Sequence, residues 1–371
     1  MNLMAKIDRI NRNVTPRLSK FATALWKEWQ RLRLPESDAN IILAVSGGAD
    51  STALLLAVDE LIKHEKLRVT PVIAHLNHGL RDESKDDAQW VKKLAKDLGY
   101  DVTVGARAVK EFVSKRKVNL EQAARDARYD FLAKAAARQD SRYVLTGHTQ
   151  DDQAETVVMR LLRGSAAEGL SGSSPVRPIT EGSEVQLVRP LLSWARRSET
   201  ENYCRFKGIE FRSDSMNEDQ SFSRVRVRKQ LLPLMQSFNN RIVETLNRTA
   251  NLLGEDASAL SSQARQLIES ATDSNNSETG TPALDVKVLA SAPAAVRRRA
   301  LREWILRARG NLRRLETVHL VGVEKLLEGD RGGRVAELPG GMTVARKGGK
   351  LQLAAKKRLK KATPATKIRA R

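Results

Sequence analysis

Residues 41–51, Ile-Ile-Leu-Ala-Val-Ser-Gly-Gly-Ala-Asp-Ser, decide the fold. Residues 41–45 are a short apolar run, which is typical of a strand buried in a parallel sheet. Two glycines follow at once, where the chain can turn sharply. Residues 51–64 then have apolar side chains at helical spacing. A strand, a glycine turn and a helix in this order predict the start of an α/β domain.

The same alternation continues outward from this segment. An amphipathic helix that contains Phe21, Leu25, Trp26 and Trp29 precedes it. After it we predict strands at 69–75, 102–106, 143–146 and 185–188, and helices at 86–98, 120–138, 151–162 and 196–207. Alternating strands and helices predict an α/β fold, an open parallel sheet with helices on both faces.

The composition changes after this first domain. We predict a catalytic domain at 1–232 and a basic helical module at 233–330, whose helix 294–308 is rich in arginine. A small β-hairpin segment at 331–355 carries glycine pairs between short alternating runs. The last residues, 356–371, contain eight Lys or Arg and no acid, which predicts a disordered basic tail.

Charge and cysteine content limit the function. The 371 residues include 65 Lys and Arg against 44 Asp and Glu, a net charge of +21, which favours a polyanionic partner. Nucleic acid, an anionic membrane surface and simple solvation of lysines all fit this charge. Neither a membrane span nor a secretory signal is present, so we expect no membrane association and a cytoplasmic location. The single cysteine, Cys204, excludes an internal disulfide and a cysteine-held cluster.

The glycine turn predicts a phosphate site. Gly47 and Gly48 let a ligand approach the backbone, and the N-H groups of the turn, with the hydroxyls of Ser46 and Ser51, would hold a pyrophosphate at the positive end of the next helix. Asp50 would repel a triphosphate unless a cation lies between them, so we assign Mg²⁺ to it. A simple helix cap is the alternative. No Gly-Lys-Ser or Gly-Lys-Thr end follows, which disfavours a Walker-type loop.

Residues 46–51 are similar to the signature of the PP-loop ATP pyrophosphatases. Three further segments resemble those of one branch, the tRNA(Ile)-lysidine synthetases: His-Leu-Asn-His-Gly-Leu-Arg at 75–81, Glu-Gln-Ala-Ala-Arg-Asp-Ala-Arg-Tyr at 121–129 and Gly-His-Thr-Gln-Asp-Asp-Gln-Ala-Glu-Thr at 147–156. The resemblance covers the first domain and continues more weakly to the hairpin.

The resemblance implies a PP-loop fold, also termed adenine nucleotide alpha hydrolase-like, with ATP and Mg²⁺ as cofactors. The implied reaction joins free L-lysine to C2 of the cytidine at the first anticodon position of an isoleucine tRNA with a CAU anticodon. It proceeds through an adenylated cytidine, releases pyrophosphate and AMP, and changes codon reading from AUG to AUA. Whether the chain is a homodimer stays open.

Acidic and basic residues on two helices are candidates for the site. Asp152 and Glu155 lie three apart, on one helix face, and could bind Mg²⁺ or the amine of lysine, so we assign catalytic roles to both, with Asp50. In the alternative, Asp151 is only a helix cap and Glu155 pairs with Arg163 or faces solvent. We expect Asp50→Ala and Glu155→Ala to abolish activity without loss of the fold.

Arg125 and Arg128 could hold the carboxylate of lysine or a phosphate, with Arg128 also catalytic. An ordinary charged helix face is the alternative. His75 and His148 are expected to contact ATP or the base, and His78 lies near them, but packing of loops explains each equally well. The histidines lack the spacing of a zinc site.

Arg224, Arg226 and Arg228 alternate with Val225 and Val227. On an extended segment all three would face one way, towards the active-site mouth or the tRNA backbone, so we assign them to substrate binding. The alternative is a charged strand edge. Val225 stands where many members of the family have Asn.

Rival functions fit the sequence less well. A tRNA thiolase usually needs catalytic cysteines, and the chain has one cysteine. A small-molecule synthetase would not need a charge of +21. An RNA-binding protein on an inactive nucleotide fold would be expected to have lost Asp50, Asp152 or Glu155, and all three are present.

Overall fold

The computed structural model describes residues 17–77, 84–106, 120–212, 219–272, 282–329 and 333–355. Its central strand is β1, Ser37–Ala44, which contains the apolar run of the sequence. Ile41, Ile42 and Leu43 are each at most 1% exposed. Ile41 and Leu43 pack into the core on one face of the sheet, and Ile42 packs into the core on the other. β1 is therefore buried on both faces, as expected for a central parallel strand.

The first sheet has six strands in the order β3-β2-β1-β4-β6-β5. Its strands β1, β2, β3, β4 and β6 are parallel, as predicted from the sequence. The edge strand β5 pairs with β6 in the antiparallel sense and was not predicted. The bounds are β2 Arg68–Asn77, β3 Asp101–Ala106, β4 Tyr143–Thr146, β5 Val176–Pro178 and β6 Gln186–Val188.

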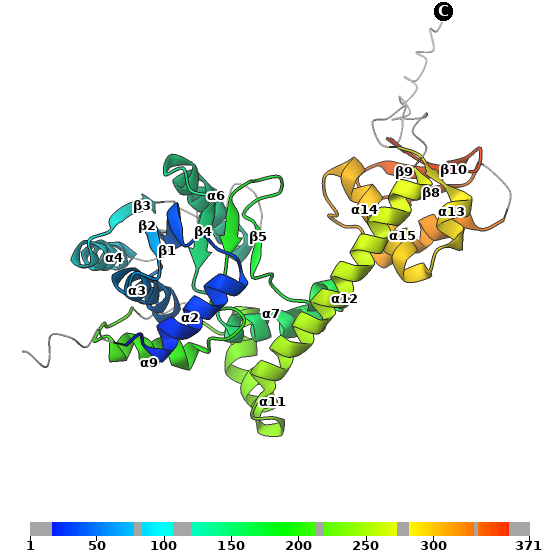
Figure 1. Ribbon diagram of the computed structural model, residues 1–371. Coiled ribbons are helices and arrows are strands. Elements are labelled where there is room, and N and C mark those ends of the chain that lie inside the picture. Colours follow the sequence, from blue (N-terminus) through cyan, green and yellow to red (C-terminus); the bar gives the residue numbers. More distant parts are fainter. Residues whose placement is uncertain are drawn as a thin grey trace, which may run out of the picture. The chain divides into compact units, whose positions relative to one another are not determined.

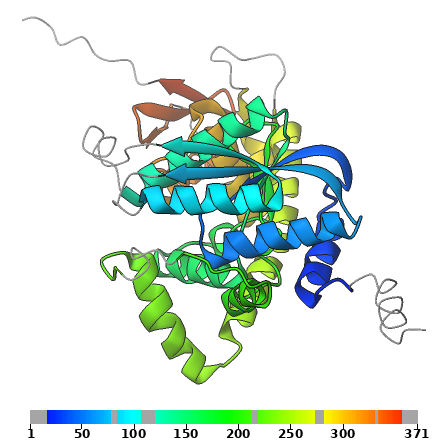
Figure 2. The same ribbon diagram turned by 90° about the vertical axis from the view of Figure 1, so that its left-hand side faces the viewer.

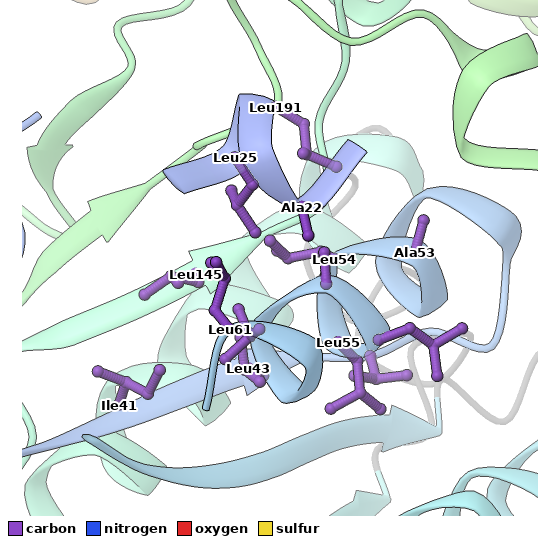
Figure 3. Packing of buried hydrophobic residues seen from close by; sticks show 14 of the residues in the cluster. Ala22, Leu25, Ile41, Leu43, Ala53, Leu54, Leu55, Leu61, Leu145 and Leu191 are labelled. Atoms are coloured by element: carbon purple, nitrogen blue, oxygen red, sulfur yellow. The ribbon is translucent and has the colours of Figure 1, made fainter. Parts of the chain in front are cut away.

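Helices cover both faces of this sheet, which confirms the predicted fold class. Figure 1 shows α6 (Leu120–Arg138) on one face and α2 (Lys20–Arg31), α3 (Ala49–Lys63) and α9 (Arg197–Phe206) on the other. In Figure 2, α3 in blue and α4 (Ser84–Leu98) in cyan lie along the strands on the same face. Figure 3 shows how Leu54 and Leu61 of α3 meet Leu25, Leu43 and Leu145 in the larger core.

A second group of helices follows the sheet and packs on α7, Gln150–Leu162. Ala154 and Val158 of α7 form a small core with Val227, Leu232 and Val243. The elements that supply this core besides α7 are the π-helical turn η2 Val227–Leu231, α11 Leu232–Phe238 and α12 Ile242–Ala271. Two short helices also contact this group: α8 Ala167–Leu170 contacts α7, and α10 Ser223–Arg226 contacts α7 and η2. This packing fixes one face of α7 against α10 and η2.

The chain forms two compact units, one ending at Gly254 and the other beginning at Glu255, within α12. The second unit has its own core around the buried Trp304 and an antiparallel sheet in the order β7-β10-β9-β8. Its elements are β7 Leu284–Asp285, α13 Val286–Ser291, α14 Ala294–Arg309, α15 Thr317–Glu324, η3 Lys325–Leu327, β8 Val335–Leu338, β9 Met342–Lys347 and β10 Lys350–Ala355.

The predicted hairpin is present as β9 and β10, but the sheet is larger, because β8 and the distant β7 pair with them. The domain ranges given from the sequence stay a prediction. The basic tail, 356–371, lies outside the described residues. Among the helices that the structure describes, none is long and apolar enough to cross a bilayer.

Candidate active site

The site lies where the order of the parallel strands reverses. β1 pairs with β2 on one side and with β4 on the other, so the chain leaves the carboxyl ends of β1 and β4 in opposite directions. Open α/β sheets bind ligands in the crevice at such a switch point. The glycine turn follows β1, and Gly147, His148 and Thr149 follow β4. The segments singled out in the sequence therefore meet at one edge of the sheet.

Gly147 shows how closely these two segments approach. A Cβ atom on Gly147 would lie 2.7 Å from the carbonyl carbon and oxygen of Asp50 and from the amide nitrogen of Ser51. Carbon atoms need about 3.5 Å for an ordinary contact. Only glycine at this position lets β4 and the first turn of α3 come together.

We expect Gly147→Ala to displace the first turn of α3. The added methyl group meets backbone atoms, which cannot rotate away, so we expect a loss of about 1–3 kcal/mol in the free energy of unfolding. We also expect weaker ATP binding, measured by calorimetry. Gly322→Ala in α15 is the control, since its Cβ would lie 3.9 Å from Ala336 Cβ, which is an ordinary van der Waals contact. ATP affinity equal to that of the unmodified protein would show that the approach of β4 to α3 does not shape the nucleotide site.

The glycine turn has the geometry of an anion cradle. Gly47 has a φ of 97°, a conformation that favours glycine, and Gly48 is the N-cap of α3 without a side-chain cap. The Ser46 and Ser51 hydroxyls lie 3.1 Å apart, and the Ser46 amide donates to Ser51 Oγ. Uncapped N-H groups at a helix N-terminus attract phosphate. This geometry is compatible with a phosphate ligand, and the assignment of these residues to a phosphate site stays a prediction.

His75 supports this turn from below. Its ring is buried, and Nδ1 donates to the carbonyl oxygen of Val45 at 2.8 Å. Burial lowers the pKa of His75, so the neutral ring is favoured. His75 therefore holds the last residue before Ser46, which fits the packing alternative considered for it. His78 lies outside the described residues.

Three carboxylates gather around one arginine, Arg197. Its Nε atom lies 3.6 Å from Asp50 Oδ2, Nη2 lies 3.7 Å from Asp152 Oδ1, and Nη1 lies 3.5 Å from Glu155 Oε1. Thr200, one turn further along α9, donates its hydroxyl to Asp50 Oδ1. The three acids that the sequence suggested for catalysis are thus brought together, by a residue that was not among the predicted ones.

The segment of Arg224, Arg226 and Arg228 was predicted to be extended, and this was wrong. It forms α10 and η2, so residues four apart share a face. Arg224 Nε donates to Glu155 Oε2 at 2.7 Å, and Arg228 Nε donates to Glu155 Oε1 at 2.6 Å. Glu155 is completely buried and contacts neither Arg163 nor solvent.

Arg226 does not join this cluster, because it points to the other side of the helix and is exposed. Val225 and Val227, its neighbours, are buried. Val227 packs into the core shared with α7 and so anchors the segment there. From the sequence, the alternation of valine and arginine favoured a strand. In the structure the segment is helical, and Val225 and Val227 are its two buried positions.

Asp151 and Asp152 have different tasks. Asp152 Oδ2 accepts from the amide of Thr149 at 2.9 Å, which closes a capping box at the start of α7. Its other oxygen, Oδ1, accepts from Arg224 Nη2 at 3.1 Å. Asp151 instead pairs with Arg196 and accepts from the amide of Arg197 at 2.8 Å. Asp151 therefore positions the N-terminus of α9, rather than capping its own helix.

The charges within this cluster are unevenly balanced. Burial and the neighbouring Asp152 raise the pKa of Asp50 from 3.8 to about 6. Burial alone would raise the pKa of Asp152 too, but Arg224, His148 and Arg197 outweigh it and hold that pKa well below its usual range. The arginines therefore stabilise the negative charge of Asp152 better than that of Asp50. A bound cation would stabilise the charge of Asp50.

The residues present fit a magnesium ion bound together with phosphates. Among the described residues, no group of three or more His, Cys, Asp and Glu forms an all-protein metal site. Mg²⁺ in nucleotide enzymes is usually held by one or two carboxylates and the phosphates of the substrate. Asp50 stands in the first turn of α3, and Asp152 lies close enough to repel it. These two oxygen donors fit that pattern.

His148 lies close enough to Asp152 and to several arginines for their charges to act on its pKa. Its Nδ1 atom lies 2.9 Å from Thr146 Oγ1, which itself donates to the carbonyl of Val188. Burial, and the positive charges of Arg189, Arg224 and Arg128, lower the pKa of His148 to about 3, although Asp152 opposes them. The ring is therefore neutral at neutral pH. It can donate a hydrogen bond to a nucleobase or accept one from it.

Arg125 and Arg128 both lie on the exposed side of α6. Arg128 is near enough to His148 to act on its charge. Arg125 instead lies over the ring of Tyr129, with its Cζ atom 5.3 Å from the ring centre. Of these two predicted residues, the structure thus associates Arg128 with the site and Arg125 with Tyr129.

Comparison with known proteins agrees with this geometry. Residues 18–235 match a PP-loop domain model, and residues 284–352 match a TilS substrate binding domain model. The tRNA(Ile)-lysidine synthase of Salinispora arenicola is 35% identical over 312 residues, which cover 84% of this chain and 89% of that protein. The chain belongs to the tRNA(Ile)-lysidine synthase family.

Other relatives of this family are longer. The tRNA(Ile)-lysidine synthase of Geobacter sulfurreducens is 37% identical over 309 residues, 82% of this chain and 63% of the relative. The chain thus spans less than two thirds of that protein's length. A solved structure, the U34-tRNA thiolase NcsA from Methanococcus maripaludis with its [4Fe-4S] cluster, shares the fold: 14% identity, a TM-score of 0.53, and coverage of 63% of this chain and 80% of that one.

Arg197 and Thr200 are the residues that sequence reasoning missed. A signal for Arg197 was present, because α9 opens with two arginines, Arg196 and Arg197, at the end where a helix attracts negative charge. Such an arrangement needs carboxylate partners. Thr200 carried no signal of its own, since a buried threonine in a helix is common. Cys204, one turn further, is buried, and its Sγ donates to the carbonyl of Ala49 at 3.5 Å.

Proposed function

We propose that this chain ligates free L-lysine to C2 of the cytidine at the first anticodon position of an isoleucine tRNA with a CAU anticodon. ATP adenylates the cytidine O2 and pyrophosphate leaves. The lysine amine then attacks C2, and AMP leaves with the oxygen. The product reads AUA instead of AUG. The observation that carries this proposal is the uncapped glycine turn beside the Asp50 and Asp152 carboxylates, in a member of this family.

The residues at the switch point suggest a division of roles for the first step. Gly47, Gly48 and the amides of the first turn of α3 bind the phosphates, and Ser46 and Ser51 add hydroxyl donors. Asp50 and Asp152 would hold Mg²⁺, which neutralises charge on the departing pyrophosphate. His148, neutral and near Arg128, is placed to contact the adenine or the cytosine.

The second step needs a lysine held with its amine towards C2. Asp50 and Asp152 offer negative charge for the ammonium group, which must lose a proton to a carboxylate or to water before its nitrogen attacks C2. Arg128 offers a guanidinium for the carboxylate of lysine. Contacts of Glu155 favour a positioning role over the catalytic role expected from the sequence, because both of its oxygens are bonded to arginines. Through Arg197 and Arg224, Glu155 fixes the charge that faces Asp50 and Asp152. Because the reaction needs tRNA, ATP and lysine together, we expect it to take place in the cytoplasm.

Incorporation of labelled lysine tests this proposal. The full chain is incubated with ATP, Mg²⁺ and an in vitro transcript of an isoleucine tRNA that carries CAU. A transcript with uridine in place of the first anticodon cytidine is the control. We expect label on the cytidine transcript alone. Release of pyrophosphate without incorporation of label would retain an adenylating enzyme but refute lysine as the nucleophile.

A further inference from the structure

A cluster of arginines surrounds Tyr129 on the first unit, beside the candidate active site. Arg125 of α6 and Arg177 of β5 both place their guanidinium groups over the Tyr129 ring, 5.3 Å and 5.1 Å from its centre. Arg189, which directly follows β6, lies close enough to Tyr129 for its positive charge to lower the pKa of the phenol. Tyr129 is itself buried, so it organises three guanidinium groups from three elements.

Two further arginines from the end of α7 extend the cluster. Arg160 and the exposed Arg163 lie close enough to influence each other, and Arg125 also acts on Arg160. Burial, followed by the repulsion from Arg125 and Arg163, lowers the pKa of Arg160. Burial also lowers the pKa of Arg189, with Arg177 and Arg125 adding to the effect. The five guanidinium groups therefore repel one another.

Backbone carbonyls hold these arginines in place. Arg160 Nη1 donates to the carbonyls of Gly169 and Gly172 at 2.6 Å, and Arg177 Nη1 donates to that of Pro178 at 2.7 Å. Arg189 Nη1 donates to the carbonyl of Ser174 at 2.7 Å. Carbonyl oxygens orient a guanidinium group but leave its full charge uncompensated.

Within the described part of the chain, this cluster of arginines makes no contact with a carboxylate. Within the described ranges, no ion pair joins any of these five arginines to an Asp or Glu; they are Arg125, Arg160, Arg163, Arg177 and Arg189. Arg189 is only 2% exposed, and its Nε atom has no hydrogen-bond partner among the described residues. A buried cationic donor without an acceptor is costly. The cluster thus has the charge and the donors for an external anion.

The extent of the cluster selects the class of anion. A single carboxylate needs one guanidinium fork, whereas this cluster draws on α6, α7 and β5 and runs from the buried Arg189 to the exposed Arg125 and Arg163. Several neighbouring guanidinium groups that backbone carbonyls hold in place can contact more than one backbone phosphate of a nucleic acid. The positive charge of Arg189 also lowers the pKa of His148, which follows β4 at the switch point. The cluster is therefore close to the candidate active site.

We propose that Arg125 and Arg177, which lie over the Tyr129 ring, form with Arg160 and Arg163 a surface that binds backbone phosphates of the substrate RNA next to the active site. This inference rests on the proposed function, because it takes tRNA to be the substrate. Its contribution is positional: phosphate contacts fix the register of the RNA strand while the cytidine enters the switch point.

Binding of the tRNA transcript to the full chain, without ATP or lysine, tests the surface. Kd is measured by fluorescence anisotropy over a series of salt concentrations for Arg163→Gln and Arg177→Gln. For each we expect Kd to rise about 3- to 10-fold at low salt, and the slope of log K against log salt to fall by about 1. Arg177→Lys, which keeps the charge, is expected to restore the slope.

Arg138→Gln is the matched control, since it removes one exposed arginine from the last turn of the same helix, α6. We expect its slope to equal that of the unmodified protein. Arg163 is exposed, so loss of folding does not explain an effect of its replacement. Salt slopes unchanged in both Arg163→Gln and Arg177→Gln would overturn the proposal.

Steady-state kinetics separates the RNA phosphate from the carboxylate of lysine. A rise in KM for lysine with unchanged tRNA affinity would assign the cluster to lysine and refute the RNA surface. Failure of the proposed function looks different. In that case the unmodified protein transfers no lysine to the transcript, while Arg163→Gln and Arg177→Gln still weaken its binding.

Discussion

Asp50→Asn is expected to reduce the tRNA-dependent release of pyrophosphate from ATP by about 10²- to 10³-fold, without loss of the fold. The amide keeps the shape of the side chain and an oxygen that accepts from Thr200. It removes the negative charge in the first turn of α3, where we propose that Mg²⁺ and the triphosphate meet. A pyrophosphate assay at saturating Mg²⁺ measures the loss.

Stability separates this effect from damage to the fold. Because burial and Asp152 raise the pKa of Asp50 from 3.8 to about 6, the native state binds more protons than the unfolded state between these pH values. Without divalent cations, this group makes stability fall as pH rises from about 4 to about 6. Asp50→Asn lacks that contribution, so at pH 7 we expect it to be at least as stable as the unmodified protein.

Asp256→Asn, at an exposed position of α12, is the matched control for the same chemical change. We expect it to alter neither pyrophosphate release nor stability. If Asp50→Asn released pyrophosphate at the normal rate, Asp50 could not be a ligand of the metal, and our assignment of the nucleotide site would be wrong.

Glu155→Gln is expected to lower the free energy of unfolding by about 3 kcal/mol, a magnitude typical of breaking a buried ion pair. Glu155 is fully buried and is bonded to Arg224 and Arg228, with Arg197 at 3.5 Å. In Glu155→Gln the negative charge of the carboxylate is lost. The guanidinium groups around it then repel one another, which destabilises the folded state. Urea unfolding measures the change. From the sequence we expected replacement of Glu155 to leave the fold intact, and its contacts reverse that expectation.

Glu255→Gln, in an exposed part of α12, is the control, and we expect it to change stability by less than about 0.5 kcal/mol. Lysine transfer by Glu155→Gln should also fall, because the arginines that face Asp50 and Asp152 lose their anchor. A Glu155→Gln protein of normal stability and normal activity would refute the positioning role.

The first sheet was predictable because its signals are local. An apolar run such as 41–45 indicates a strand buried on both faces, and β1 has that environment. Helices such as α6 and α14 are rich in residues that favour helices and were predicted to within one residue. The glycine turn was predictable for the same reason, since its chemistry depends on adjacent residues.

The features that the sequence did not predict depend on contacts between residues far apart in the chain. Arg197 joins Asp50 to Asp152 only because α9 packs against α3, about 150 residues away in the chain. The pairing of β7 with β10 is a two-residue contact across the second unit and leaves little pattern in the sequence. At 224–228, alternation of valine and arginine fits a strand by period, but the core shared with α7 favours a helix.

The environment of Cys204 determines how the protein reacts with alkylating and oxidising agents. Burial raises the pKa of Cys204 to about 12, with the nearby Asp50 adding to the effect, so almost no thiolate exists at neutral pH. Alkylating agents and peroxide react with the thiolate, and here they meet a neutral group enclosed beneath α3. The folded protein should therefore neither cross-link through sulfur nor lose activity by oxidation of cysteine. A reaction at Cys204 would report that α9 has separated from the nucleotide site.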